Sequence, residues 1–244
     1  MKKHIPNTIT CCNLISGCIA TLYASQANYS MALTFIIIGA VFDFFDGFAA
    51  RLLHVSSPVG KELDSLADDI TFGFAPATIV FSMLQTALAN SACGAESCPI
   101  AMLLPYAAFI IAAFSALRLA KFNLDERQTT SFIVLPTPAN ALFWAALSLT
   151  LHTHGMLVPS TTLAACLLIG VLLSSYLLVA EIPMFALKFK SYGWKGNELR
   201  FSFIIISALL LVILKWGGFS LIIVLYILTS ILNNMFGTKV AHNK

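Results

Sequence analysis

The chain has 244 residues, of which 59% are hydrophobic and only 10% are charged. Soluble domains carry roughly a quarter charged residues, so this composition, with a mean hydropathy of +0.87, excludes an ordinary soluble protein. The formal net charge of +3 is explained by membrane topology and by attraction to anionic lipid headgroups, and we expect no nucleic-acid partner.

The hydrophobic residues form blocks separated by short polar breaks, as expected for helices of about 20 residues that cross a bilayer. Eight blocks are predicted, covering in chain order 8–25, 31–53, 65–90, 101–120, 138–153, 161–180, 201–216 and 218–234. The first and fifth blocks are short or rich in polar residues. We find no cleavable signal peptide, internal repeat or second domain. The expected fold class is all-α, a polytopic transmembrane helical bundle forming a single domain over 1–244.

Lysine and arginine are distributed unequally along the chain. With eight spans, the N-terminus and every second loop lie on the same side of the membrane. That side collects 13 of the 14 Lys and Arg residues, and only Lys215 lies on the opposite side. Cytoplasmic loops carry such an excess of cations. We therefore expect a multi-pass protein of the cytoplasmic (inner) membrane with both termini in the cytoplasm.

The cysteines fall into two groups. Four lie in apolar blocks, where they are expected to be small buried hydrophobic residues: Cys11, Cys12, Cys18 and Cys166. Cys93 and Cys98 lie in a polar break on the expected outer side, and they could form a disulfide if that compartment is oxidising. None of the cysteine spacings is typical of a zinc site.

The stretch "VFDFFDGFAARLLHVSSPVGKELDSLADD", residues 41–69, holds six of the 11 acidic residues. On a helix, the first two acids share a face with Gly47 and Ala50, and Arg51 lies at its margin. Pro58 and Gly60 indicate a turn, after which the next two acids are i,i+4 neighbours. Two adjacent antiparallel helices would then direct four carboxylates to one point near the cytoplasmic surface: Asp43, Asp46, Asp64 and Asp68.

Four carboxylates remain ionised together in a low-dielectric site only if cations neutralise them. Oxygen ligands at this density suit Mg²⁺, Mn²⁺ or Ca²⁺, and four of them can hold two ions about 4 Å apart, an arrangement that promotes phosphoryl displacement. Gly47 and Ala50 leave room for a phosphate group, and Arg51 can donate to its oxygens. The alternative is a proton or ion pathway in a cation-coupled transporter.

The spacing of these residues resembles a family signature. Asp43-x-x-Asp46-Gly47-x-x-Ala50-Arg51, eight residues, Gly60, three residues, Asp64, three residues and Asp68 matches the signature of the CDP-alcohol phosphotransferases at all eight positions. The segments "IPNTITCCNLISG", "SALRLAKFN" and "FIVLPTPANA" are similar to segments of the phosphatidylserine synthase branch. The resemblance covers roughly residues 5–140 and favours serine as the acceptor.

The resemblance implies a homodimeric enzyme that transfers a phosphatidyl group from CDP-diacylglycerol to L-serine, giving phosphatidylserine and CMP. It implies two divalent cations, Mg²⁺ or Mn²⁺ with Ca²⁺ as a third candidate, bound by all four aspartates. Asp68 would also be the general base that deprotonates the acceptor hydroxyl. The CDP-lipid site would be lined by Gly47, Ala50, Arg51 and Gly60. Glycerol phosphate or inositol phosphate is the alternative acceptor, which would need further cations nearby.

Two further polar sets are candidates for substrate contact. One recurs at three-residue steps on a single face of the first helix and could contact cytidine, although helix capping competes for the first member: Asn7, Thr10 and Asn13. The other follows the fourth span, where a cation could bind the serine carboxylate: Arg118, Lys121 and Asn123. Glu62 and Asp69 are expected to have no metal role.

Overall fold

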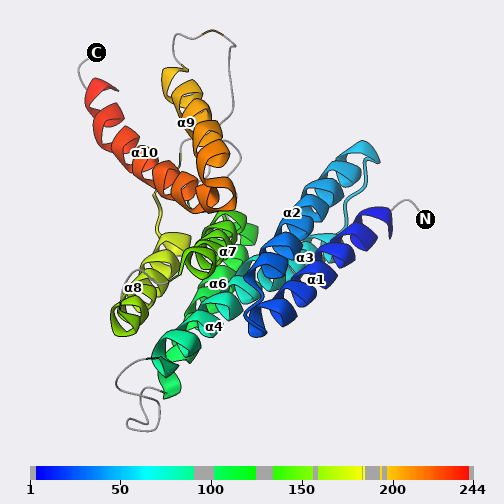
Figure 1. Cartoon of the computed structure of the whole chain (residues 1–244). Coiled ribbons are helices and arrows are strands. Elements are labelled where there is room, and N and C mark those ends of the chain that lie inside the picture. Colours follow the sequence, from blue (N-terminus) through cyan, green and yellow to red (C-terminus); the bar gives the residue numbers. More distant parts are fainter. Residues whose placement is uncertain are drawn as a thin grey trace.

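The computed structural model describes residues 4–90, 102–124, 134–155, 159–182, 184, 193 and 197–241, without the side chains of 235–241. All regular elements in these ranges are helical, which confirms the expected all-α class (Figure 1). In chain order they are α1 (His4–Ser25), α2 (Tyr29–Leu52), α3 (Pro58–Asp68), the π-helical turn η1 (Asp69–Phe74), α4 (Ala75–Ala89), the 3-10 helix η2 (Leu104–Phe109), α6 (Ile110–Leu124), α7 (Thr137–His154), α8 (Ser160–Val179), α9 (Glu198–Leu214), the 3-10 helix η3 (Lys215–Gly217) and α10 (Gly218–Ala241).

Six stretches of the described residues are long and apolar enough to cross a bilayer, as expected for a polytopic membrane protein. They are His4–Ser25, Tyr29–Leu52, Pro58–Ala89, Leu104–Leu124, Ser160–Val179 and Glu198–Asn234. The fifth predicted block, now α7, is not among them. The last stretch combines α9 and α10, which run in opposite directions on either side of η3 (Figure 1). The count of eight spans and the cytoplasmic position of the termini therefore stay predictions.

Small side chains allow α1, α2 and η1 to pack very closely. A Cβ atom on Gly39 of α2 would lie 2.5 Å from Thr71 Cγ2 and 2.9 Å from Asn13 Oδ1. A Cβ atom on Gly17 of α1 would lie 2.8 Å from the Cα of Thr71. The Thr71 hydroxyl donates to the backbone oxygen of Asn13 over 3.1 Å. Because no larger residue fits at either glycine without movement, these contacts set the spacing of the three elements.

The segment from α3 through η1 to α4 is a continuous helical rod with a change of winding in the middle. Ser57 caps its start, where the Ser57 hydroxyl accepts from Gly60 N over 3.0 Å, and Pro58 occupies the first turn. The six residues of η1 are wound as a π-helix, an insertion that changes the direction of the side chains that follow. The α3 part is amphipathic, with exposed and half-buried residues except at the buried Ala67, whereas α4 is buried along most of its length.

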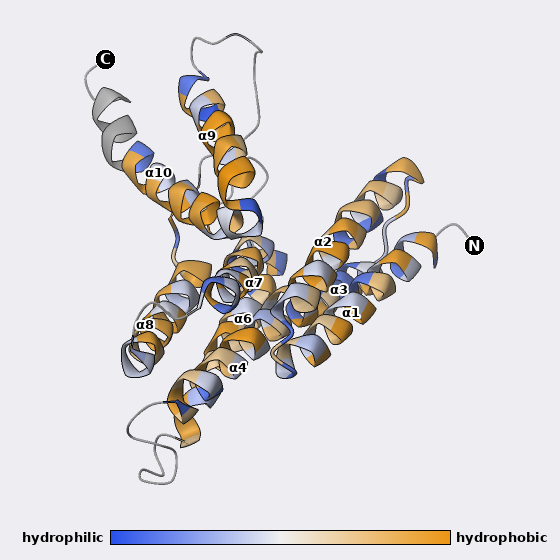
Figure 2. Cartoon of the chain, in the orientation of Figure 1, coloured by the Kyte–Doolittle hydropathy of each residue, from blue (hydrophilic) through white to orange (hydrophobic). Residues whose placement is uncertain are grey.

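Apolar residues predominate along the helices (Figure 2), and their large exposed side chains form much apolar surface on the outside of the bundle. It is most extensive on α9 and α10, where only 11% of the most apolar window is buried. These two helices stand apart from α1 and α2 in Figure 1. Such a surface is stable only against lipid or another apolar partner, in agreement with a membrane protein.

The cysteine predictions are corrected in part. Cys11, Cys18 and Cys166 are exposed on helix surfaces and Cys12 is half-buried, so the expectation of buried residues is wrong for the first three. In a membrane helix, a surface position facing lipid is as apolar as the core, and hydrophobicity alone does not distinguish the two. Cys93 and Cys98 lie outside the described residues.

Candidate active site

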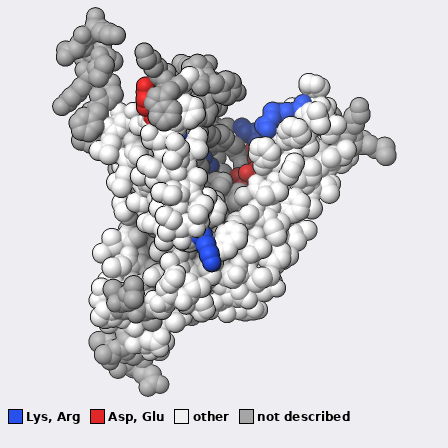
Figure 3. All heavy atoms as spheres, turned by 45° about the horizontal axis from the view of Figure 1, so that its top comes forward, with Lys and Arg blue, Asp and Glu red and all other residues white. Residues whose placement is uncertain are grey.

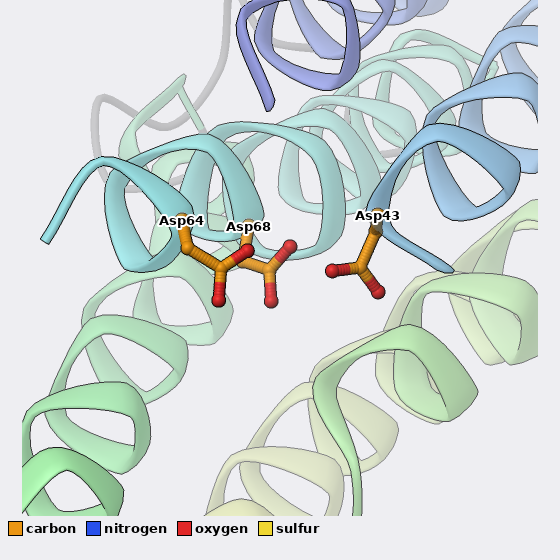
Figure 4. Close-up of side chains that lie close together, drawn as sticks. All are labelled: Asp43, Asp64 and Asp68. Atoms are coloured by element: carbon orange, nitrogen blue, oxygen red, sulfur yellow. The ribbon is translucent and has the colours of Figure 1, made fainter. Parts of the chain in front are cut away.

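Three carboxylates meet at one point between α2 and α3. Asp43, Asp64 and Asp68 each present one oxygen atom, and these three atoms lie within 4.8 Å of one another. Figure 4 shows the three side chains directed toward a common space, two from α3 and one from α2. All three are half-buried. The i,i+4 spacing in α3 accounts for two of them, and α1, which packs against both α2 and α3, brings the third beside them.

The fourth aspartate of the signature has a different environment. Asp46 is only 6% exposed, and its Oδ2 accepts a hydrogen bond of 2.6 Å from the Thr10 hydroxyl of α1. It is not among the three residues whose oxygens share one point. Thr10 therefore holds Asp46 beside the triad of Asp43, Asp64 and Asp68.

Asn13 of α1 holds the general-base candidate in a similar way. Its side chain is fully buried, and its Nδ2 donates to Asp68 Oδ1 over 3.1 Å. The polar face predicted on the first helix is thus present, but two of its three members contact carboxylates of the protein. These two hydrogen bonds could not be predicted from the sequence, because the packing of α1 against α2 and α3 creates them.

An open pocket of about 280 Å³ lies beside the carboxylates. Five predicted CDP-lipid residues and two of the aspartates line it: Asn7, Thr10, Gly47, Ala50, Gly60, Asp46 and Asp64. Its other lining residues were not predicted from the sequence: Pro6, Val55, Ser56, Ser57 and Lys61. Most of these come from the turn before α3, and the helix-capping sequence Ser57-Pro58 was the available signal. Figure 3 shows acidic atoms inside a hollow with basic atoms near its rim.

Arg51 lies next to this pocket without lining it. Its side chain is exposed and passes near Gly47, where a Cβ atom would be 3.5 Å from Arg51 Nη1. The absence of a side chain at Gly47 therefore leaves the guanidinium close to the pocket wall.

Of the second polar set, predicted to bind serine, Arg118 is the member that lies at the site. Arg118 is 7% exposed, donates from Nη1 to the Thr137 hydroxyl over 3.3 Å, and interacts electrostatically with Asp68. Its guanidinium also lies 5.3 Å from the centre of the Phe122 ring. Lys121 is exposed and is not part of these contacts. Of the three predicted residues, Arg118 is the one with a described electrostatic interaction with the general-base candidate.

Asn123 connects two helices instead of facing the carboxylates. Its Nδ2 donates to the Ser65 hydroxyl of α3 over 2.8 Å, and its backbone oxygen accepts from Lys61 Nζ over 2.9 Å. The two acids expected to have no metal role, Glu62 and Asp69, are outside the triad.

The donor set of the triad suits a hard divalent cation. It consists of carboxylate oxygens alone, the ligands that Mg²⁺, Mn²⁺ and Ca²⁺ prefer. One of these oxygens, Asp64 Oδ1, is buried without a hydrogen-bond partner, and an oxygen in this state is costly unless a donor or a cation binds it. The triad could therefore hold a metal ion.

Comparison with known proteins gives consistent matches. The model of the family described as CDP-alcohol phosphatidyltransferase matches residues 3–174. A relative from Bacillus subtilis (strain 168), named CDP-diacylglycerol–serine O-phosphatidyltransferase, is 34% identical over 189 residues, which are 74% of this chain and 89% of the relative. A relative of the same name from Helicobacter pylori (strain ATCC 700392 / 26695) is 30% identical over 245 residues, covering 98% of this chain and 94% of the relative.

Proposed function

Because the chain belongs to the CDP-alcohol phosphatidyltransferase family, we propose that it is a CDP-diacylglycerol–serine O-phosphatidyltransferase. The reaction transfers a phosphatidyl group from CDP-diacylglycerol to the hydroxyl of L-serine, giving phosphatidylserine and CMP. The relatives from Bacillus subtilis and Helicobacter pylori carry this name. The observation that supports it best is the triad of Asp43, Asp64 and Asp68 next to an open pocket lined by signature residues.

Asp68 is the proposed general base. One of its oxygens accepts from Asn13 Nδ2, which leaves the other oxygen available to accept the proton of the serine hydroxyl. The serine oxygen then forms a bond to the β-phosphorus of the lipid donor. At the same time the bond from that phosphorus to the bridging oxygen breaks, and CMP leaves with the electron pair. No covalent intermediate with the enzyme is needed.

The four aspartates are the proposed ligands of two divalent cations, Mg²⁺ or Mn²⁺. When bound, such cations neutralise the charge that develops on the diphosphate. Asp43, Asp64 and Asp68 already share one point, and Thr10 holds Asp46 beside them.

The pocket is the proposed site of the CDP group, with Gly47, Ala50 and Gly60 providing close approach. Arg51, at the edge of the pocket, is the proposed partner of a phosphate oxygen. Arg118 is the proposed ligand of the serine carboxylate, since it is the buried cation near Asp68. Lys121 and Asn123 are the other candidates for this role.

We further propose that the protein is located in the cytoplasmic membrane with its active site facing the cytoplasm. The unequal distribution of Lys and Arg supports this orientation. The homodimer implied by the family resemblance also stays a proposal, and light scattering of the purified protein in detergent would test it.

The deciding experiment measures CMP release by the purified protein supplied with CDP-diacylglycerol, a divalent cation and one acceptor at a time. We expect release with L-serine and little with glycerol phosphate or inositol phosphate. Release with a phosphorylated acceptor alone would reassign the acceptor within the family. No release with any acceptor would reject the enzyme and favour the alternative of a cation-coupled transporter.

A further inference from the structure

Lys61 lies in the pocket but has no assigned role. It is the second residue after Ser57-Pro58-Val59 in the first turns of α3, beside Gly60. Among the described residues that line the pocket, Lys61 alone carries a positive charge. The same pocket is lined by Asp46 and Asp64, so Lys61 and these carboxylates border the same space.

The ammonium group of Lys61 has unused hydrogen-bonding capacity. Its Nζ donates to the backbone oxygen of Asn123 over 2.9 Å, and a lysine ammonium has three N–H donors. Within the described part of the chain, Lys61 forms no ion pair with a carboxylate. Two N–H groups therefore remain for a further acceptor, and the hydrogen bond to Asn123 limits where the side chain can lie.

The charge and position of this group suit phosphate oxygens. A lysine is a point charge that binds phosphate well, and the N-terminal end of α3 adds a partial positive charge on the same side of the pocket. We propose that Lys61 binds the diphosphate of the nucleotide donor, an inference that rests on the proposed function. The same residue joins the donor pocket to α6, the helix that carries Arg118.

A purely structural role for Lys61 makes a different prediction. In that case Lys61 would only fasten α3 to α6, a task shared by the hydrogen bond of 2.8 Å from Asn123 Nδ2 to the Ser65 hydroxyl. Ser65 does not line the pocket. The substitution Ser65→Ala therefore weakens the connection between the helices and leaves the pocket unchanged.

The test compares Lys61→Met, which keeps the aliphatic stem, with Lys61→Arg and Ser65→Ala. Glu62→Gln is the matched control, because Glu62 is an exposed neighbouring charge outside the pocket. Calorimetry measures the binding of CDP and of cytidine to each purified protein in detergent. Kinetics then give the KM values for CDP-diacylglycerol and for serine.

We expect Lys61→Met to weaken CDP binding about tenfold, the size of one lost hydrogen bond to a charged group, with cytidine binding unchanged. The KM for the lipid donor should rise and that for serine should not. Lys61→Arg should retain most of the affinity, and Ser65→Ala and Glu62→Gln should match the wild type. Equal CDP affinity in Lys61→Met and wild type, equal losses in Lys61→Met and Ser65→Ala, or no CDP binding by the wild type would overturn the inference. A wild type that binds CDP through Lys61 but releases no CMP would instead reject the proposed reaction.

Discussion

The hydrogen bond from Asn13 to Asp68 gives the sharpest test of how α1 contributes to catalysis. Replacing Asn13 with Ala removes the donor that lies 3.1 Å from Asp68 Oδ1, and the carboxylate is then free to rotate. A hydrogen bond to a charged group is worth about 1.5–3 kcal/mol, which corresponds to about 10- to 150-fold in rate. We expect a fall in kcat of that size, because the bond directs the proposed base toward the serine hydroxyl.

The assay is CMP release at saturating L-serine over a range of CDP-diacylglycerol concentrations. If Asn13 only positions Asp68, kcat falls while the KM for the lipid donor stays within about twofold. Ser16→Ala is the matched control, since Ser16 is also buried on α1 but donates only to the backbone oxygen of Cys12. A folded Asn13→Ala variant with kcat within threefold of the wild type would refute the positioning role. An equal loss in Ser16→Ala would show that any substitution on this face disturbs the helix packing.

Three further predictions concern the base, the metal site and the packing. Asp68→Asn should abolish CMP release and keep part of the CDP-lipid binding, measured by calorimetry; near-normal turnover would mean that another group is the base. Chelation by EDTA should stop CMP release, and Mn²⁺ or Mg²⁺ added back in separate arms should restore it; activity that persists in EDTA would argue against metal dependence. Gly39→Ala should lower the thermal stability by about 1–3 kcal/mol, because its new methyl group would lie 2.5 Å from Thr71 Cγ2, and an unchanged melting temperature would contradict the close packing.

Much of the site could be predicted because helix periodicity is local. Asp64 and Asp68 are four residues apart, so a regular helix already directs them to one side, and the structure has them in the same triad. The polar turn after α2 is short, so the next helix was expected to run back antiparallel to α2. This arrangement predicts that Asp43 lies near Asp64 and Asp68. The helical blocks could also be recognised from local sequence, because each is a nearly continuous apolar run.

The remaining features depend on contacts between distant segments, which periodicity does not describe. The bond from Thr10 to Asp46 joins residues 36 positions apart, and that from Asn13 to Asp68 joins residues 55 positions apart. Lys61 was missed because the pocket that it lines is completed by residues of another helix, such as Asn7. The exposed cysteines were missed because lipid-facing and buried positions have the same hydrophobicity.

The π-helical turn η1 has a consequence for how the rod from Pro58 to Ala89 is divided into faces. A regular helix advances about 100° per residue, so the extra residue of a π-helical turn shifts the phase of everything beyond it by about that angle. The stripe that carries Asp64 and Asp68 therefore does not continue along α4. The carboxylate-bearing face of α3 and the buried face of α4 can therefore point in different directions around the axis of the rod. Deleting one residue from 69–74 would make the rod a regular α-helix and rotate α4 relative to α3. Either the carboxylates would then turn away from their common point, or the buried face of α4 would turn away from the core.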